Sequence, residues 1–273
     1  MSNSIQTDIS AMNASRNIKI HQKNIQSNME KLSSGYKINT AADDAAGLAI
    51  SEKLKGELTG LEQAQLNVQD TVSLLQTAEG GMGSIHNMLN RMVELTTKAS
   101  NGVYDTTVDR AAIQDEINSI ISEINRVTKS INFNNKTLLD GSFKDVNFQI
   151  GADEKDVLTV TIGGLDATAL GLDKIDVSSP EKAQEAMQIV KDAINQVSRE
   201  RSKVGATQNR LEYTMANLEE THLNLTEANS RIRDVDYAKM MMECTKNQLL
   251  EQVSTTILTH RMSNAQNILQ LFY

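Results

Sequence analysis

Two adjacent carboxylates, Asp43 and Asp44, stand among small residues in the segment INTAADDAAGLAI (residues 38–50). Such a pair has three chemical interpretations: a metal site, an acid/base pair, or the start of a helix. Neighbouring residues on a helix point about 100° apart, so these carboxylates do not converge on one ion. Thr40 precedes Asp43 by three residues, which is the spacing of a capping box. We therefore interpret Thr40, Asp43 and Asp44 as a capped helix start without a metal, whose small residues let another helix approach closely.

Two further features are candidates for chemistry, a lone cysteine and a glycine-rich segment. Cys244 is the only cysteine, and no motif links it to the histidines, which are His21, His86, His222 and His260. The segment AEGGMGS (residues 78–84) lacks the Lys-Ser/Thr pair of a phosphate-binding loop, and we interpret it as a soft point in a long helix. The sequence thus predicts no catalytic residue, no metal and no cofactor, and the protein is not expected to be an enzyme.

The composition bounds the class of protein. The 273-residue chain carries a net charge of −8, which argues against nucleic acid as the main partner. It has no Trp, one Pro and few aromatic residues, which favours long helices over a compact enzyme core. No apolar run reaches the roughly 18 residues of a membrane helix, and the first residues lack the apolar stretch of a secretory signal peptide. On these grounds alone we expect a cytoplasmic protein.

Heptad spacing of apolar residues is the strongest signal, and it predicts three long helices at about residues 54–96, 113–131 and 190–232. Apolar positions that recur at alternating steps of four and three are typical of a coiled-coil seam. The seam positions are Leu61, Val68, Leu75, Leu89, Ile117, Ile124, Leu211, Leu218, Leu225 and Ile232. Polar residues at seam positions, such as His86 and His222, are expected to set register and partner choice.

The pattern changes between the second and third helices and again at the two ends. Two alternating runs, residues 146–150 and 157–162, flank polar turn residues and predict a β-hairpin. Ser179 followed by Pro180 predicts the start of the next helix. Both ends carry narrow apolar stripes at helical spacing, and such a stripe on a lone helix is marginal in water. The end helices are therefore expected to pair with each other or with other copies.

Several segments match a known pattern in order along the chain. They are KLSSGYKINTAADDAAGLAI (31–50), MVELTTKASNG (92–102), IQDEINSIISEINRV (113–127), FNNKTLLDG (133–141), VGATQNRLEYTMANL (204–218), ANSRIRDVDYAKMMMECTKNQLLEQVSTTIL (228–258) and QNILQL (266–271). Together these segments resemble the bacterial flagellins, over both ends and nearly the whole chain. The chain departs from the family at Ala265, where flagellins often have proline.

The resemblance implies a mainly α fold in which long antiparallel coiled-coil helices form a rod with a small β-hairpin insert. It implies a terminal helical domain made of residues 1–42 and 234–273, which forms the inner tube of a filament. The rod domain is expected to span residues 43–233, with the hairpin region at about 132–178. Thr40, Asp43 and Asp44 then mark the joint between the two domains. Because many members insert further domains in the middle, we expect a minimal two-domain flagellin.

The function implied by the resemblance is that of a structural subunit that self-assembles into the helical flagellar filament for motility. Such subunits are secreted unfolded by the flagellar type III export apparatus to the extracellular filament, which replaces the cytoplasmic expectation. The implied partners are other copies, an export chaperone, and hook-associated and cap proteins, with no nucleic acid and no membrane. The segment LNRMVEL (residues 89–95) resembles the one recognised by Toll-like receptor 5 of animals. The receptor-binding and inter-subunit residues carried over are Arg91, Glu94, Leu95 and Glu116.

Three alternatives remain beside the flagellin interpretation. A hook–filament junction protein shares similar ends, although the segments AADDAAGLAI and IQDEI favour a flagellin. A cytoplasmic coiled-coil adaptor would not need apolar helices at both extreme ends. An enzyme lacks support because no triad, metal cluster or phosphate loop is found in the sequence.

Overall fold

The computed structural model describes residues 8–103, 105 and 108–270, and long helices make up most of them. The chain divides into two compact units. The terminal unit contains residues up to Gly56 and from Asn224 onward, and the central unit spans Glu57–Leu223. The expected domain boundaries, at 42/43 and 233/234, lie near breaks between helices. The compact units divide instead inside α2 (Ala45–Ala99) and α4 (Pro180–Arg233), so each of these helices contributes to both units.

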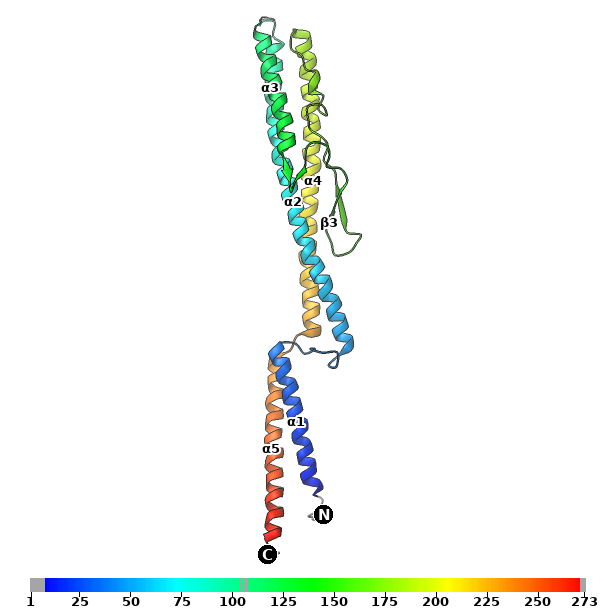
Figure 1. Cartoon of the computed structure of the whole chain (residues 1–273), viewed down its shortest axis with the longest axis vertical. Helices are drawn as coiled ribbons and strands as arrows, with labels where there is room; N and C mark the ends of the chain where they lie inside the picture. Colours follow the sequence, from blue (N-terminus) through cyan, green and yellow to red (C-terminus); the bar gives the residue numbers. More distant parts are fainter. Residues whose placement is uncertain (1–7, 104, 106–107, 271–273) are drawn as a thin grey trace. The chain divides into compact units, whose positions relative to one another are not determined.

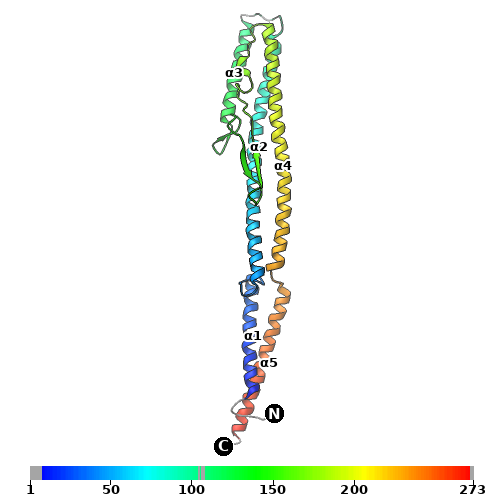
Figure 2. The same cartoon turned by 90° about the vertical axis from the view of Figure 1, so that its right-hand side faces the viewer.

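In the terminal unit, α1 (Ile9–Ser34) and α5 (Tyr237–Gln270) lie side by side and antiparallel (Figures 1 and 2). Helix α1 begins at Asp8, whose carboxylate accepts the N–H groups of Ser10 and Ala11 at 2.9 and 3.2 Å. It ends at Gly35, whose φ of 77° lies in the left-handed region that glycine adopts without steric penalty. The chain then enters the loop that leads into α2.

The central unit is built on α2, α3 (Asp109–Ser130) and α4, which run alongside one another (Figure 1). Its core contains one heptad row of α2 together with the facing rows of α3 and α4, at Leu61, Val68, Leu75, Leu89, Ile117, Ile124, Leu211 and Leu218. Leu225 and Ile232 belong to the terminal unit and are half-buried. A second heptad row of α2 is also buried, at Ala64, Thr71, Ala78, Ile85, Met92 and Ala99. The polar positions next to this row, such as Glu79 and His86, are only half-buried.

Two small antiparallel hairpins lie between α3 and α4. Strands β3 (Val146–Gln149) and β4 (Val157–Val160) pair with Val146 opposite Val160, and together they form the predicted hairpin. Strands β1 (Asn132–Phe133) and β2 (Lys136–Thr137) form a second hairpin that the sequence analysis did not predict. A 3₁₀ turn, η1 (Leu172–Lys174), precedes α4. The expected mainly α fold with long helices and a small β insert is confirmed.

Candidate functional site

The interface between α1 and α5 buries few side chains completely. Among the described side chains of these two helices, only the small groups of Ala14, Cys244 and Ser254 are buried. Larger apolar residues in step with them are half-buried, at Ile18, Ile25, Leu32, Met240 and Leu258. Gln22 donates to the carboxylate of Glu251 at 2.8 Å across the interface. Because its larger apolar groups remain partly in contact with water, this helix pair gains only part of the stability that their full burial would give.

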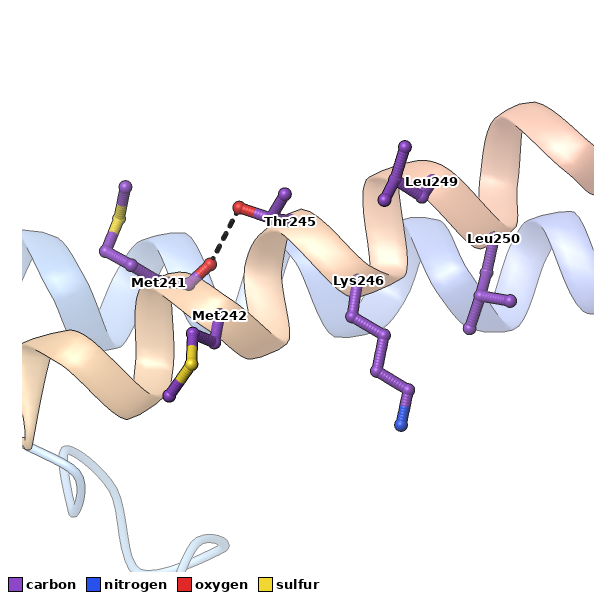
Figure 3. A pocket seen from close by; sticks show the side chains of 6 residues that line it. All are labelled: Met241, Met242, Thr245, Lys246, Leu249 and Leu250. Carbon is purple, nitrogen blue, oxygen red and sulfur yellow. Dashed lines mark hydrogen bonds between the residues drawn. The ribbon is translucent and has the colours of Figure 1, made fainter.

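A second set of large apolar side chains on the same helices is exposed, and we call this set the terminal apolar face. On α1 this face contains Ile9, Met12, Ile20 and Met29, and Met12 is 64% exposed. On α5 it contains Met241, Met242, Leu249, Leu250, Val253, Ile257 and Met262, and Met242 is 67% exposed. Figure 3 shows Met241, Met242, Leu249 and Leu250 projecting from α5. Together with Thr245 and Lys246 they line a shallow groove of about 550 Å³. Clustered apolar side chains of this extent mark an interaction surface.

The joint between α1 and α2 explains the two adjacent carboxylates. Oδ2 of Asp43 accepts the backbone N–H groups of Asn39 and Thr40 at 3.2 and 3.0 Å, and the hydroxyl of Thr40 at 3.1 Å. The ammonium of Lys31 lies 3.1 Å from Oδ1 of Asp43. These hydrogen bonds, first that from the Thr40 backbone and then that from Lys31, lower the pKa of Asp43 to about 2. Asp43 is therefore a structural anion that holds the loop.

Asp44, and not Thr40, caps the start of α2. Oδ1 of Asp44 accepts the N–H groups of Ala46 and Gly47 at 3.1 and 3.0 Å, which is the N-cap arrangement. The prediction that Thr40 is the cap is wrong because residues 40–43 form a turn, closed by the N–H of Asp43 donating to the carbonyl of Thr40, before the helix begins.

Gly47 shows what the small residues of this segment accommodate. A Cβ at Gly47 would lie 2.6 Å from Oδ2 of Asp44 and 2.8 Å from Cδ1 of Ile38. The small residue thus accommodates the incoming loop, and not another helix as the sequence suggested. Ala45 and Ala46 are exposed.

Arg233, at the end of α4, contacts several residues of the joint, and its role was not predicted from the sequence. Its guanidinium lies 4.7 Å from the ring centroid of Tyr36 and donates to the carboxylate of Glu52 at 2.7 Å. Its carbonyl accepts the N–H of Lys37 at 2.8 Å, next to an antiparallel bridge between Tyr36 and Asp234. These contacts bind the ends of α2 and α4 to the terminal unit, which explains why the compact units divide inside those helices.

A charged cluster on α2 and α3 contains three of the four residues expected to contact a receptor. Arg91 donates to Glu116 from Nε and Nη2 at 2.9 and 2.8 Å, and to Glu94 from Nη1 at 2.8 Å. The hydrogen bonds to Glu94 and then to Glu116 raise the pKa of Arg91. All three side chains are exposed, whereas Leu95 is only 3% exposed and lines the depression beneath them. Leu95 therefore supports this surface from below and does not present its side chain.

The other sequence candidates for chemistry have structural surroundings. Cys244 is buried in the terminal unit, and His222 lies 3.2 Å from the carboxylate of Glu62. Among the described residues, no group of three or more His, Cys, Asp or Glu side chains is placed to hold a metal ion. Within the same part of the chain, no helix combines the length and apolar character needed to cross a membrane.

Comparison with known proteins identifies the family. The family model for the bacterial flagellin N-terminal helical region matches residues 5–144, and that for the C-terminal helical region matches residues 187–272. The chain is 43% identical to a flagellin of Bacillus subtilis, covering 98% of this chain and 99% of that protein. It is 38% identical to a flagellar filament 30.7 kDa core protein of Treponema maltophilum, with coverage of 98% and 99%.

Solved structures share the fold of this chain. A crystal structure of Bacillus cereus flagellin matches with a TM-score of 0.51 and 29% identity, over 56% of this chain and 88% of that one. A flagellar hook-associated protein of Vibrio parahaemolyticus shares the fold, with a TM-score of 0.60 and 14% identity, over 70% of this chain and all of that one. The chain therefore belongs to the bacterial flagellins, the structural subunits of the extracellular flagellar filament.

Proposed function

We propose that copies of this chain join through the terminal apolar face, and that this joining builds the filament from its inner tube outward. The observation that carries the proposal is the set of large apolar side chains that α1 and α5 leave exposed, beyond those half-buried between the two helices. Burying one such side chain fully contributes about 1.5–3 kcal/mol. Because a filament is open-ended, the contacts must be head-to-tail and non-closing.

Two exposed valines provide a matched test of the assembly surface. Val253 on α5 is 53% exposed, and Val157 at the start of β4 is 39% exposed. We expect Val253→Glu to abolish salt-induced filaments, as seen by electron microscopy, because it buries an unpaired charge in the interface. Val157→Glu introduces the same charge outside the terminal apolar face and should leave assembly intact. Normal filaments from Val253→Glu monomers would refute the proposal.

The proposed route to the filament is export through the flagellar type III apparatus, with a chaperone shielding the chain beforehand. The support is the family membership together with the terminal apolar face, which exposes large apolar side chains in the monomer and so promotes aggregation. Hook-associated and cap proteins are the further partners in this proposal. Immunoblots of cells and medium test it, because a strain without a working export apparatus should retain the chain inside the cell.

We also propose that the free monomer is recognised by Toll-like receptor 5 through the cluster of Arg91, Glu94 and Glu116. The support is the resemblance of this segment together with the exposed, fixed geometry of the three charged groups. Arg126, paired with Glu123 on α3, is an exposed ion pair outside this cluster and serves as a matched control.

Receptor affinity measured on the two arginine variants decides this second proposal. Arg91→Ala should weaken binding about tenfold or more, because charge-assisted hydrogen bonds contribute about 1.5–3 kcal/mol. Arg126→Ala should bind like the unmodified chain. Equal affinities for the two variants would count against the proposal.

The hook–filament junction alternative has weaker support. The hook-associated structure shares the fold at 14% identity, whereas identity to flagellins reaches 43% over nearly the full length. Abundance in sheared filaments separates the two, since a junction protein is present in few copies.

A further inference from the structure

The methionines of this chain are distributed unequally between the two units. Exposed methionines occur only in the terminal unit, among the residues whose side chains the structure describes, at Met12, Met29, Met241, Met242 and Met262. In the central unit Met82 and Met92 are fully buried, and Met88, Met187 and Met215 are half-buried. The five exposed residues all belong to the terminal apolar face, and we call them the exposed methionines.

We propose that the exposed methionines form an oxidation site through which hydrogen peroxide blocks assembly of the free monomer. The inference rests on the proposed assembly function, because it assigns the chemistry to the same surface. The oxidation rate of a thioether rises with its exposure to solvent, so these side chains should react before the methionines of the central unit. Met241 and Met242 are neighbours on α5, are 54% and 67% exposed, and project from the helix near Leu249 and Leu250 (Figure 3).

The chemical step is balanced with peroxide as the only oxidant. The thioether sulfur attacks one peroxide oxygen, the O–O bond breaks and an S–O bond forms. The sulfur loses two electrons, and the second oxygen takes them, receives the proton of the transferred oxygen and leaves as water. The product sulfoxide is polar, and burying it in an apolar interface without hydrogen-bond partners is unfavourable. Each buried sulfoxide should therefore raise the critical concentration for assembly about tenfold.

Assembly should in turn protect the same side chains. In the proposed filament the terminal apolar face is covered by neighbouring copies, whereas in the monomer it meets solvent. In this proposal the free monomer is the vulnerable stage and the polymer is the protected stage. Protection of the exposed methionines on assembly would distinguish an interface from a surface that stays exposed in the filament.

The test compares peroxide oxidation of the monomer with that of the filament, in a Cys244→Ala background that removes thiol chemistry. Peptide mass spectrometry gives the rate at each methionine, and sedimentation gives the polymerised fraction. In the monomer, Met241 and Met242 should oxidise at least about tenfold faster than Met82 and Met92. In preformed filaments, the oxidation rates of these two pairs of methionines should be similar. The oxidised monomer should fail to polymerise, and methionine sulfoxide reductases with a dithiol reductant should restore assembly.

Two leucine variants locate the effect. With all five exposed methionines changed to Leu, peroxide should alter the polymerised fraction less than twofold relative to the untreated variant. With Met88, Met187 and Met215 changed to Leu instead, the peroxide effect should persist in full. Normal assembly of the oxidised monomer, or equal loss in both variants, overturns the inference. If the untreated chain does not polymerise, both the assembly proposal and the predicted peroxide block of assembly are refuted. Mass spectrometry still measures the order in which the methionines oxidise.

Discussion

Neighbouring glycines in the GGMG segment of α2 should respond in opposite ways to the same substitution. A Cβ at Gly81 would lie 2.8 Å from Cδ1 of Leu139 and 3.0 Å from Cγ1 of Ile131, and Leu139 is fully buried. At Gly80 and Gly83 a Cβ meets nothing within 4 Å. Exchange of Gly for Ala inside a helix stabilises it by up to about 1 kcal/mol, whereas overpacking a filled core costs about 1–3 kcal/mol.

The helix-propensity gain is common to both positions and cancels in the comparison. The free energy of unfolding of the Gly80→Ala variant should therefore be about 1–3 kcal/mol higher than that of the Gly81→Ala variant. Urea denaturation of the monomer, followed by circular dichroism, measures this difference as a shift in midpoint at constant slope. Gly83→Ala is a second open control and should behave like Gly80→Ala. Equal or greater stability of Gly81→Ala would show that Gly81 is not required for close packing against the β1–β2 region.

Three further predictions concern the joint and the end of α2. Asp44→Ala removes the N-cap of α2 and should destabilise its first turn by about 1 kcal/mol, seen as faster amide exchange there but not in α3. Because the pKa of Asp43 falls from 3.8 to about 2 on folding, its contribution is complete above about pH 4 and disappears as the pH drops toward 2. Asp43→Asn should lack this acid-dependent loss, and an unchanged acid titration would contradict the assignment. Arg110 is buried and donates to the carbonyl of Ala99 at 3.0 Å, so Arg110→Met should cost about 1–3 kcal/mol in urea denaturation, and no loss would contradict it.

The heptad pattern predicted the helices of the central unit because large aliphatic residues at seam spacing carry a strong periodic signal. Leu75 and Leu89 are fully buried at such positions. The second buried row of α2 could not be found in this way. Its members include Ala64, Thr71 and Ala78, and small or hydroxylated residues are buried because another element approaches closely, which is a property of the packing.

The short β1–β2 hairpin was missed although a signal exists in the sequence. Asn134 and Asn135 have φ values of 46° and 61°, and two consecutive asparagines tolerate the left-handed conformation that a two-residue turn requires. The strands it joins have only two residues each, too short for an alternating pattern to show.

At the joint, the side chains of Thr40, Asp43 and Asp44 could each accept the first backbone N–H groups of α2, and their spacing in the sequence favoured Thr40. The choice between them depends on Lys31, which lies at the far end of α1 and engages Asp43, so that Asp44 is left to cap α2. The same limit applies to Arg233, whose partners Tyr36 and Glu52 are distant in sequence.

Local periodicity and the ordered family segments were thus sufficient for the helices, the β3–β4 hairpin and the flagellin assignment, because each depends on residues close together in the chain. Which side of α1 and α5 faces inward was decided only by tertiary structure. The apolar stripes at both ends predicted a partner, but the helix pair accounts for only part of them. It buries Ala14, Cys244 and Ser254, half-buries larger residues such as Ile25 and Leu32, and leaves a further set of large apolar side chains exposed. The physical reason is that each helix of a pair covers only one side of its partner, so the apolar groups on the remaining sides of α1 and α5 meet solvent.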